Sequence, residues 1–298
     1  MLPWYFFALA TAFLAAFASI VEKRTLSFKD ESPIQYATTF GVINAALSFV
    51  LLPLADFSFP LTAYAALYLC SVIGSTAGFY LIAKALKSGE ISKVSPLLNI
   101  NPVFVAVLAM VFLGESLSKM QYMGIGLTVV GSYVLESDGG FKHLLGPLKR
   151  LFTHHTEKLM LAATGLYAAA SILNKYVLGF TDSITVLILL QAMVAFNFLC
   201  MMLFRARGSI FDRLRFVEHE ASVEWHWVLV AALLTTSYRL LQMQAFSMAM
   251  VSLVVPIKRL STLIATVIGG ELFREDRLLH KVVACIVMIV GAYLVIVM

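Results

Sequence analysis

Charged residues are scarce in this 298-residue chain, at 13% against the roughly 25% of a soluble globular protein. Hydrophobic residues make up 60% of it instead. No polar stretch is long enough for a separate soluble catalytic domain. The composition therefore predicts an integral membrane protein. We assign the net charge of +5 to loops beside the membrane and not to nucleic-acid binding.

Signatures of metal and cofactor chemistry are also missing. The three cysteines lie in apolar segments at spacings that fit no metal site, and the six histidines lie in loops or at helix edges. The chain has no HExxH, GxSxG or phosphate-cradling glycine motif. We expect no cofactor, no metal and no enzymatic activity. No carboxylate is placed clearly at mid-membrane, which favours exchange or facilitated transport over a proton relay.

Long hydrophobic runs dominate the remainder. A membrane-spanning helix needs about 20 mostly apolar residues, and ten runs reach or approach that length. We predict an all-α integral membrane fold with ten transmembrane helices. They span residues 3–22, 34–54, 62–83, 94–113, 121–137, 159–178, 185–204, 226–245, 250–272 and 281–298.

The two halves of the chain resemble each other. At an offset of 160 residues, Pro96 falls on Pro256 and Gly131 falls on Gly291. A five-helix unit that occurs twice must enter the membrane from opposite sides, which is an inverted-topology repeat. The predicted units are a first repeat at 1–137, a linker at 138–158 and a second repeat at 159–298.

Basic residues support this topology. Seventeen of the 22 Lys and Arg residues fall in the loops after the odd-numbered helices, and Lys119 alone falls on the opposite face. An excess of Lys and Arg marks the cytoplasmic side. We therefore predict an inner (plasma) membrane protein of bacterial type with both termini outside.

Two stretches carry a family resemblance. They are SPLLNINPVFVAVLAMVFLGESLSKMQYMGIGLTVVGSYVLE (95–136) and VVPIKRLSTLIATVIGGELFREDRLLHKVVACIVMIVGAYLVIV (254–297). Their proline, "FLGE"-like segment and glycine-containing last helix resemble EamA-type domains of the drug/metabolite transporter superfamily. The resemblance implies a ten-helix carrier with a central cavity and alternating access. It also implies cytoplasmic termini, opposite to the charge bias. The second copy departs from the first at Arg274, which stands where the first has Gly114.

Lys258 and Arg259 stand together inside the apolar run 251–270. A basic residue at mid-bilayer costs about 2.5–3.5 kcal/mol, and Pro256 removes a backbone donor beside the pair. We expect a water-filled cavity in which the pair binds an anionic substrate. The pair also resembles that of the plastid phosphate translocators, which implies phosphate binding. Alternatively, the pair contacts carbonyls freed by the proline, Glu271 or a lipid phosphate.

Further substrate-binding candidates lie in neighbouring helices. Arg239, beside Tyr238, suits a bidentate grip on carboxylate or phosphate. Asn99 is the repeat counterpart of Arg259, and Asn101 follows it. Both amides suit an uncharged contact with a substrate, or hydrogen bonds between helices.

Lys175, Tyr80 and Gln242 complete the candidates. Snorkelling of the long side chain to the membrane surface is the alternative for Lys175. Glu115 lies at a tight connection, where we expect it to cap the helix that follows.

These features favour a secondary carrier for a small anionic metabolite with a phosphate, phosphonate or carboxylate group. An exporter of amino acids or amphiphilic metabolites is the alternative within the same class. A lipid-phosphate flippase is an alternative of another class, since aromatic residues make up 12% of the chain. The expected partners are the substrate and membrane lipids, and the sequence predicts no oligomeric state.

Overall fold

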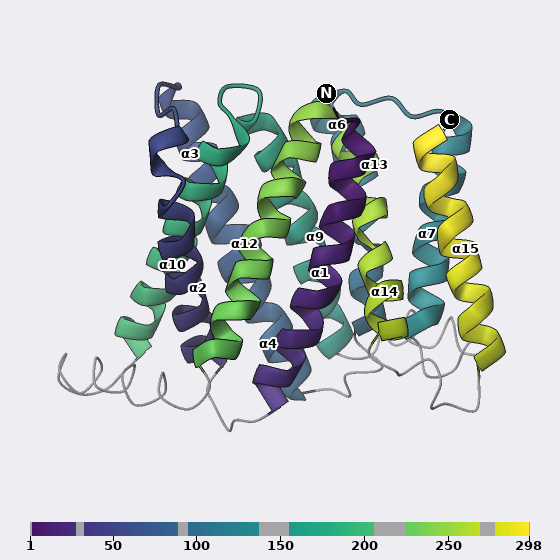
Figure 1. Ribbon diagram of the computed structural model, residues 1–298, viewed down its shortest axis with the longest axis horizontal. Helices are drawn as coiled ribbons and strands as arrows, with labels where there is room; N and C mark the ends of the chain where they lie inside the picture. The colour runs from purple at the N-terminus through teal and green to yellow at the C-terminus, as the bar shows by residue number, and fades with distance from the viewer. Residues whose placement is uncertain are drawn as a thin grey trace.

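The computed structural model describes residues 2–27, 33–88, 95–136, 155–205, 225–268 and 278–297, and its elements in these ranges are helical (Figure 1). The elements are α1 (Trp4–Ser27), α2 (Pro33–Phe49), η1 (Leu52–Leu54), α3 (Leu61–Cys70), η2 (Ser71–Gly78), α4 (Phe79–Ser88), η3 (Ser95–Ile100), α6 (Asn101–Leu113), α7 (Lys119–Glu136), α9 (His155–Val177), α10 (Ser183–Arg205), α12 (Trp225–Met248), α13 (Val251–Lys258), α14 (Leu260–Ile268) and α15 (Leu278–Val297). Each predicted segment falls on these helices, which confirms the all-α fold.

Three of the predicted helices are not uniform. The third passage contains η2, a π-helical stretch between α3 and α4. The fourth consists of the 3-10 helix η3 followed by α6, and the ninth is divided into α13 and α14 at Arg259. Pro96, Pro102 and Pro256 lie in the fourth and ninth passages, where a missing backbone donor weakens the helix. Sequence hydropathy predicted one continuous helix in each place.

Helix packing follows the duplication. The last helices of the two halves, α7 and α15, pack together, and so do the second helices, α2 and α10. The first helix of each half packs on the third helix of the other, as α1 on α12 and α9 on α3. Gly124 lies against Gly291, and Gly131 lies against Met288, so α7 and α15 run in opposite directions. The halves are therefore related as inverted repeats.

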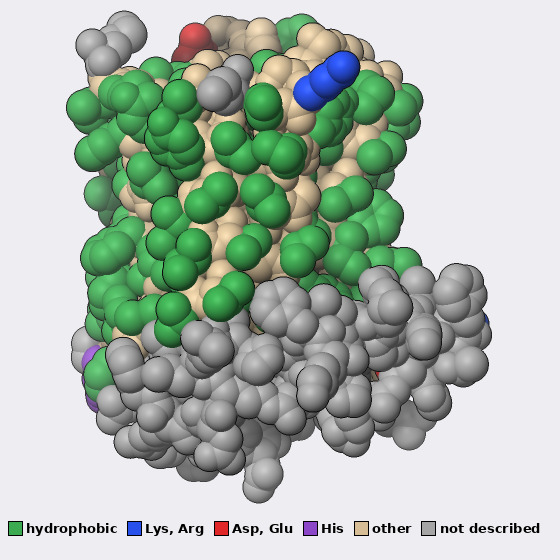
Figure 2. Space-filling view, turned by 90° about the vertical axis from the view of Figure 1, so that its right-hand side faces the viewer, with side chains coloured by type: hydrophobic (Ala, Val, Ile, Leu, Met, Phe, Trp, Pro, Cys, Tyr) green, Lys and Arg blue, Asp and Glu red, His purple; other side chains and the backbone are tan. Residues whose placement is uncertain are grey.

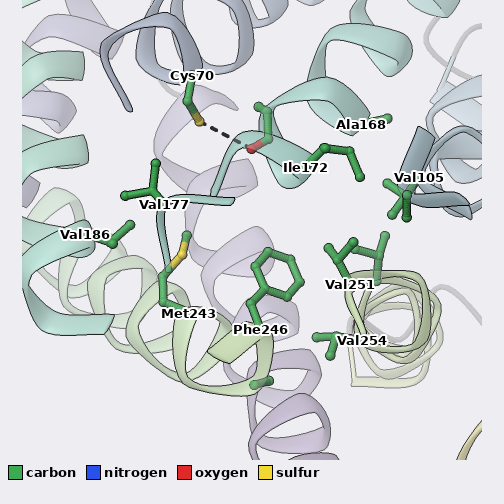
Figure 3. Packing of buried hydrophobic residues seen from close by; sticks show 14 of the residues in the cluster. Cys70, Val105, Ala168, Ile172, Val177, Val186, Met243, Phe246, Val251 and Val254 are labelled. Carbon is green, nitrogen blue, oxygen red and sulfur yellow. Dashed lines mark hydrogen bonds between the residues drawn. The ribbon is translucent and has the colours of Figure 1, made fainter. Parts of the chain in front are cut away.

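Small residues allow this close packing. A Cβ atom added to Gly291 would lie 2.6 Å from Thr128 Oγ1 and 2.7 Å from the Gly124 carbonyl oxygen. In lipid there is no hydrophobic driving force between helices, so close van der Waals packing stabilises this helix pair instead. Figure 3 shows the apolar core that α3, α9, α10, α12 and α13 share, including Phe246, which is fully buried.

The outer surface suits lipid. Hydrophobic side chains cover the described part of the face in Figure 2, and blue and red side chains stand out at its upper edge. Within the described ranges, five helical stretches are long and apolar enough to cross a membrane, and two shorter apolar stretches lie in α2 and α15. Both chain ends lie at the same end of the bundle (Figure 1). Most of the basic loop residues lie outside the described ranges, so the orientation stays a prediction.

Candidate substrate-binding cavity

A cavity of about 510 Å³ lies between the two halves. Its walls come from α1, α2, α3, η2, α4, η3 and α6 of the first half and from α9, α10, α12, α13 and α14 of the second. Six of the predicted residues line it, and four of them are Lys258, Arg259, Arg239 and Tyr238. Asn101 and Gln242 line it as well. The cavity thus gathers charged and polar side chains inside an otherwise apolar bundle.

Lys258, the last residue of α13, contacts two uncharged groups of α12. Its Nζ atom donates a hydrogen bond to Gln242 Oε1 at 2.7 Å and lies 4.8 Å from the centre of the Tyr238 ring. The two partners are four residues apart and so lie on one face of α12. Neither of these two contacts carries a negative charge, and the carboxylate that interacts electrostatically with the ammonium group is that of Glu22 in α1.

Arg259 follows Lys258 directly and lies between α13 and α14. Its backbone N–H donates to the Pro256 carbonyl at 3.0 Å, in the turn that divides α13 from α14. Its guanidinium group lines the cavity and interacts electrostatically with Glu136 at the end of α7. Glu271, the alternative partner considered from the sequence, lies outside the described residues.

Glu22 of α1 is an acidic cavity residue that the sequence interpretation placed at a helix end. Thr235 Oγ1 donates a hydrogen bond to Glu22 Oε1 at 3.2 Å, and Arg239 and Lys258 both interact electrostatically with its carboxylate. The sequence placed no carboxylate clearly at mid-membrane, and Glu22 is the last residue of the candidate membrane span Trp4–Glu22. Helix α1 continues to Ser27, so Glu22 lies more than one turn inside it.

A helical pattern in α1 could have revealed this position. Ala8, Ala12 and Ala15 are buried at spacings of three or four residues, and Ser19 and Glu22 continue the same series. Both of these residues line the cavity. Glu22 therefore continues a buried row of small residues along α1. This helical spacing indicates a position inside the bundle, whereas hydropathy alone does not.

The two asparagines make bonds between helices. Asn101 lines the cavity, but its Nδ2 atom donates to the Thr164 carbonyl of α9 at 3.1 Å. Asn99 is fully buried away from the cavity lining, and its Nδ2 atom donates to the Ser132 carbonyl of α7 at 3.1 Å. Both hydrogen bonds join neighbouring helices, which is the alternative to substrate binding that the sequence left open for these amides.

Lys175 and Tyr80 lie apart from the lining. The Lys175 ammonium group donates to the carbonyls of Phe246 and, at 2.9 Å, of Ala249, where α12 ends. A cation there satisfies free carbonyls and complements the helix dipole. It is thus held by the backbone, in contrast to the snorkelling alternative. Tyr80 is 39% exposed.

Glu115 caps a helix of the other half. Its carboxylate accepts hydrogen bonds from the Val251 N–H at 2.8 Å, from the Ser252 N–H at 3.1 Å and from the Ser252 hydroxyl. These groups begin α13, whereas the sequence predicted a cap on the following helix, α7. This contact joins the first half to the helix that carries Lys258.

The π-helix η2 forms another part of the wall. Gly74 and Ser75 line the cavity, and a Cβ atom on Gly74 would lie 2.4 Å from the Ala170 Cβ of α9. Stretches of π-helix are often found at functional sites.

Among the residues that the structure describes, no group of three or more His, Cys, Asp or Glu side chains is placed to hold a metal.

Comparisons with known proteins agree with this architecture. The model of the EamA-like transporter family matches residues 2–136 and 156–297. A solved crystal structure superposes with a TM-score of 0.71 at 15% identity, over 98% of this chain and 95% of that one. A Sinorhizobium sp protein described as an uncharacterized transporter in the cobO 3' region is 32% identical over 65 residues. That match spans 22% of this chain and 46% of the relative, which is under half of its length.

Proposed function

The chain belongs to the EamA-like transporter family of the drug/metabolite transporter superfamily, and we propose that it is a secondary carrier of small organic anions. The observation that supports this most is the state of Lys258. Lys258 lines the cavity, and the two close contacts of its ammonium group, Gln242 and Tyr238, are uncharged, while the Glu22 carboxylate interacts with it electrostatically. Arg239 adds a second cation that can bind a carboxylate or phosphate through two nitrogens.

In this mechanism the two halves move against each other around the cavity. Lys258 and Arg239 bind the anionic group, Arg259 adds positive potential, and the polar wall contacts the rest of the substrate. The cap from Glu115 to α13 keeps the helix end of one half attached to the other. The division into 1–137, 138–158 and 159–298 gives the moving units, and the charge bias favours termini on the outside of a bacterial inner membrane.

Transport in liposomes tests the proposal. Purified protein is reconstituted with unlabelled malate or glycerol 3-phosphate inside, and uptake of the labelled compound is measured. We expect uptake that depends on the internal anion and that Lys258→Met abolishes. Equal uptake by the wild type and this variant would contradict an anion site at Lys258.

A zwitterion exporter is the second candidate, and Glu22 favours it. A carboxylate facing Arg239 and Lys258 across one cavity would match the amino and carboxylate groups of an amino acid. The same assay with alanine and phenylalanine distinguishes the candidates. Uptake of these amino acids alone, lost in Glu22→Gln, would support the exporter.

A further inference from the structure

A second polar cluster lies in the cavity wall, on helices α2, α10 and α12. Asn44, Gln191 and Thr236 form it, with exposed fractions of 4%, 1% and 9%. Asn44 and Gln191 both line the cavity. None of the three carries a charge, and none was among the substrate-binding residues predicted from the sequence. Polar side chains this deeply buried need hydrogen-bond partners.

The hydrogen bonds of this cluster leave one group unused. Thr236 Oγ1 donates its single proton to Asn44 Oδ1 at 2.9 Å, and Asn44 Nδ2 donates to the Phe40 carbonyl at 2.7 Å. Gln191 Oε1 lies 3.5 Å from Thr236 Oγ1, and Gln191 Nε2 has no hydrogen-bond partner within the described residues.

Turning the Gln191 amide over does not remove the deficit. The amide nitrogen would then face the Thr236 hydroxyl oxygen, and the amide oxygen would be left over. In either orientation one polar atom of Gln191 lacks a hydrogen-bond partner within the described residues, and Gln191 is part of the cavity wall. A buried amide without a partner is unfavourable, so this position is suited to a polar group of a substrate or to the water that the group displaces.

The cluster and the cations follow one another along α12. Thr236, Arg239 and Gln242 are each three residues apart, which corresponds to a rise of about 4.5 Å per step. Gln242 in turn holds Lys258. One cavity thus has cations at one level and an uncharged amide at a neighbouring level, within the span of a short organic molecule.

We infer that Gln191, supported by Asn44 and Thr236, forms a second subsite that binds a hydroxyl or carbonyl group of the anion held by Lys258 and Arg239. This inference rests on the proposed function and deepens it. It names the substrate class as short organic anions that carry an uncharged oxygen group, in preference to plain alkyl anions. A hydroxyl group both donates and accepts, so it satisfies either orientation of the amide. Its absence leaves the buried amide unpaired, and the site discriminates on that basis.

Matched ligand pairs test the subsite. Malate differs from succinate by one hydroxyl group, and glycerol 3-phosphate differs from propyl phosphate by two. Binding to the full-length protein in detergent is measured by calorimetry. We expect the hydroxylated member of each pair to bind at least about tenfold more tightly to the wild type, the effect of one buried hydrogen bond.

Two substitutions remove the amide while keeping its size. Gln191→Leu and Gln191→Met should reduce the preference within each pair to about twofold or less, and two variants guard against one that fails to fold. Gln244→Leu is the matched control, because Gln244 is half-buried on α12 and is not part of the cavity lining. It should keep the tenfold preference.

The outcomes separate the subsite from the transporter proposal. Anion binding that depends on Lys258 but shows no preference within the pairs overturns the subsite alone. A preference that survives in both Gln191 variants also overturns it. Failure of all four compounds to bind the wild type overturns the anion carrier and the subsite together.

Discussion

The fourth and ninth passages, η3–α6 and α13–α14, are the repeat counterparts of each other and differ in what they offer the cavity. At an offset of 160 residues, Leu98 and Asn99 stand where Lys258 and Arg259 stand in the second copy. The first pair is apolar and neutral, and the Asn99 side chain donates within the first half. The second pair is charged, and both of its members line the cavity.

The difference indicates that the two repeat counterparts have similar backbones but different roles. Both copies use a proline-containing, irregular helix, so each leaves the regular backbone hydrogen-bonding pattern near the cavity. Only the second copy carries cations there. A duplicated pair of charges would add electrostatic repulsion in a region of low dielectric constant, whereas amides in the first copy hold neighbouring helices.

We expect Lys258→Met to have the largest effect, because it removes a charge that distinguishes the ninth passage from the fourth. Loss of a charged hydrogen bond to the substrate is expected to weaken malate binding by about 10- to 100-fold. Calorimetry on the purified protein measures the change. If Lys258→Met binds malate as tightly as the wild type, the ninth passage does not hold the anion.

The glycines of α7 and α15 mark a region where the two copies have remained alike. Gly131 and Gly291 are repeat counterparts, and a Cβ atom on either would lie within 3.0 Å of a backbone oxygen of the opposite helix. We expect Gly131→Ala and Gly291→Ala to lower the free energy of unfolding by similar amounts, about 1–3 kcal/mol.

Gly126→Ala is the matched control on α7, because nothing lies within 4 Å of its added Cβ atom. Its stability should stay within about 0.5 kcal/mol of the wild type. Thermal unfolding in detergent compares the three variants. A loss as large in Gly126→Ala as in Gly291→Ala would show that close helix contact is not the cause.

Glu115→Gln tests the connection between the first half and the ninth passage. The amide keeps one acceptor oxygen in place of two, so α13 loses part of its cap and the stabilisation of its dipole. We expect a loss of about 1–2 kcal/mol in the free energy of unfolding. Ser252→Ala removes the hydroxyl contact alone and should lose less. Equal melting temperatures for Glu115→Gln and the wild type would contradict a stabilising cap.

Asn99→Leu should have the smallest effect and sharpens the contrast with Lys258. It removes the hydrogen bond to Ser132, which is worth about 1 kcal/mol of stability. Malate affinity should stay within about twofold, because Asn99 is not part of the cavity lining. A fall in affinity comparable with that of Lys258→Met would place the first copy in the binding site.

Hydropathy and repeats in the sequence predicted the all-α fold, because bilayer thickness fixes the length of a spanning helix. They also predicted Lys258, Arg259 and Arg239, since a charge inside an apolar run is costly without a polar environment. These three side chains do come together at one cavity.

Residues whose roles depend on packing between distant helices were not predictable in the same way. Glu115 lies next to α7 in the sequence but caps α13, and Lys175 finds its carbonyl partners at the end of α12. Glu22 was placed at a helix end because hydropathy falls before α1 stops. Gln191 carries no charge, so its position within an apolar run gave little signal.

A thermal-stability screen tests the central claim most directly. The wild type and the Lys258→Met/Arg239→Met variant are heated in detergent with malate, glycerol 3-phosphate, alanine or a cationic amine, since a ligand of the folded state raises the melting temperature. We expect the two anions to raise the melting temperature of the wild type and to leave that of the double variant unchanged. Stabilisation by alanine or the amine alone, equal in both proteins, would contradict an anion site in the second half.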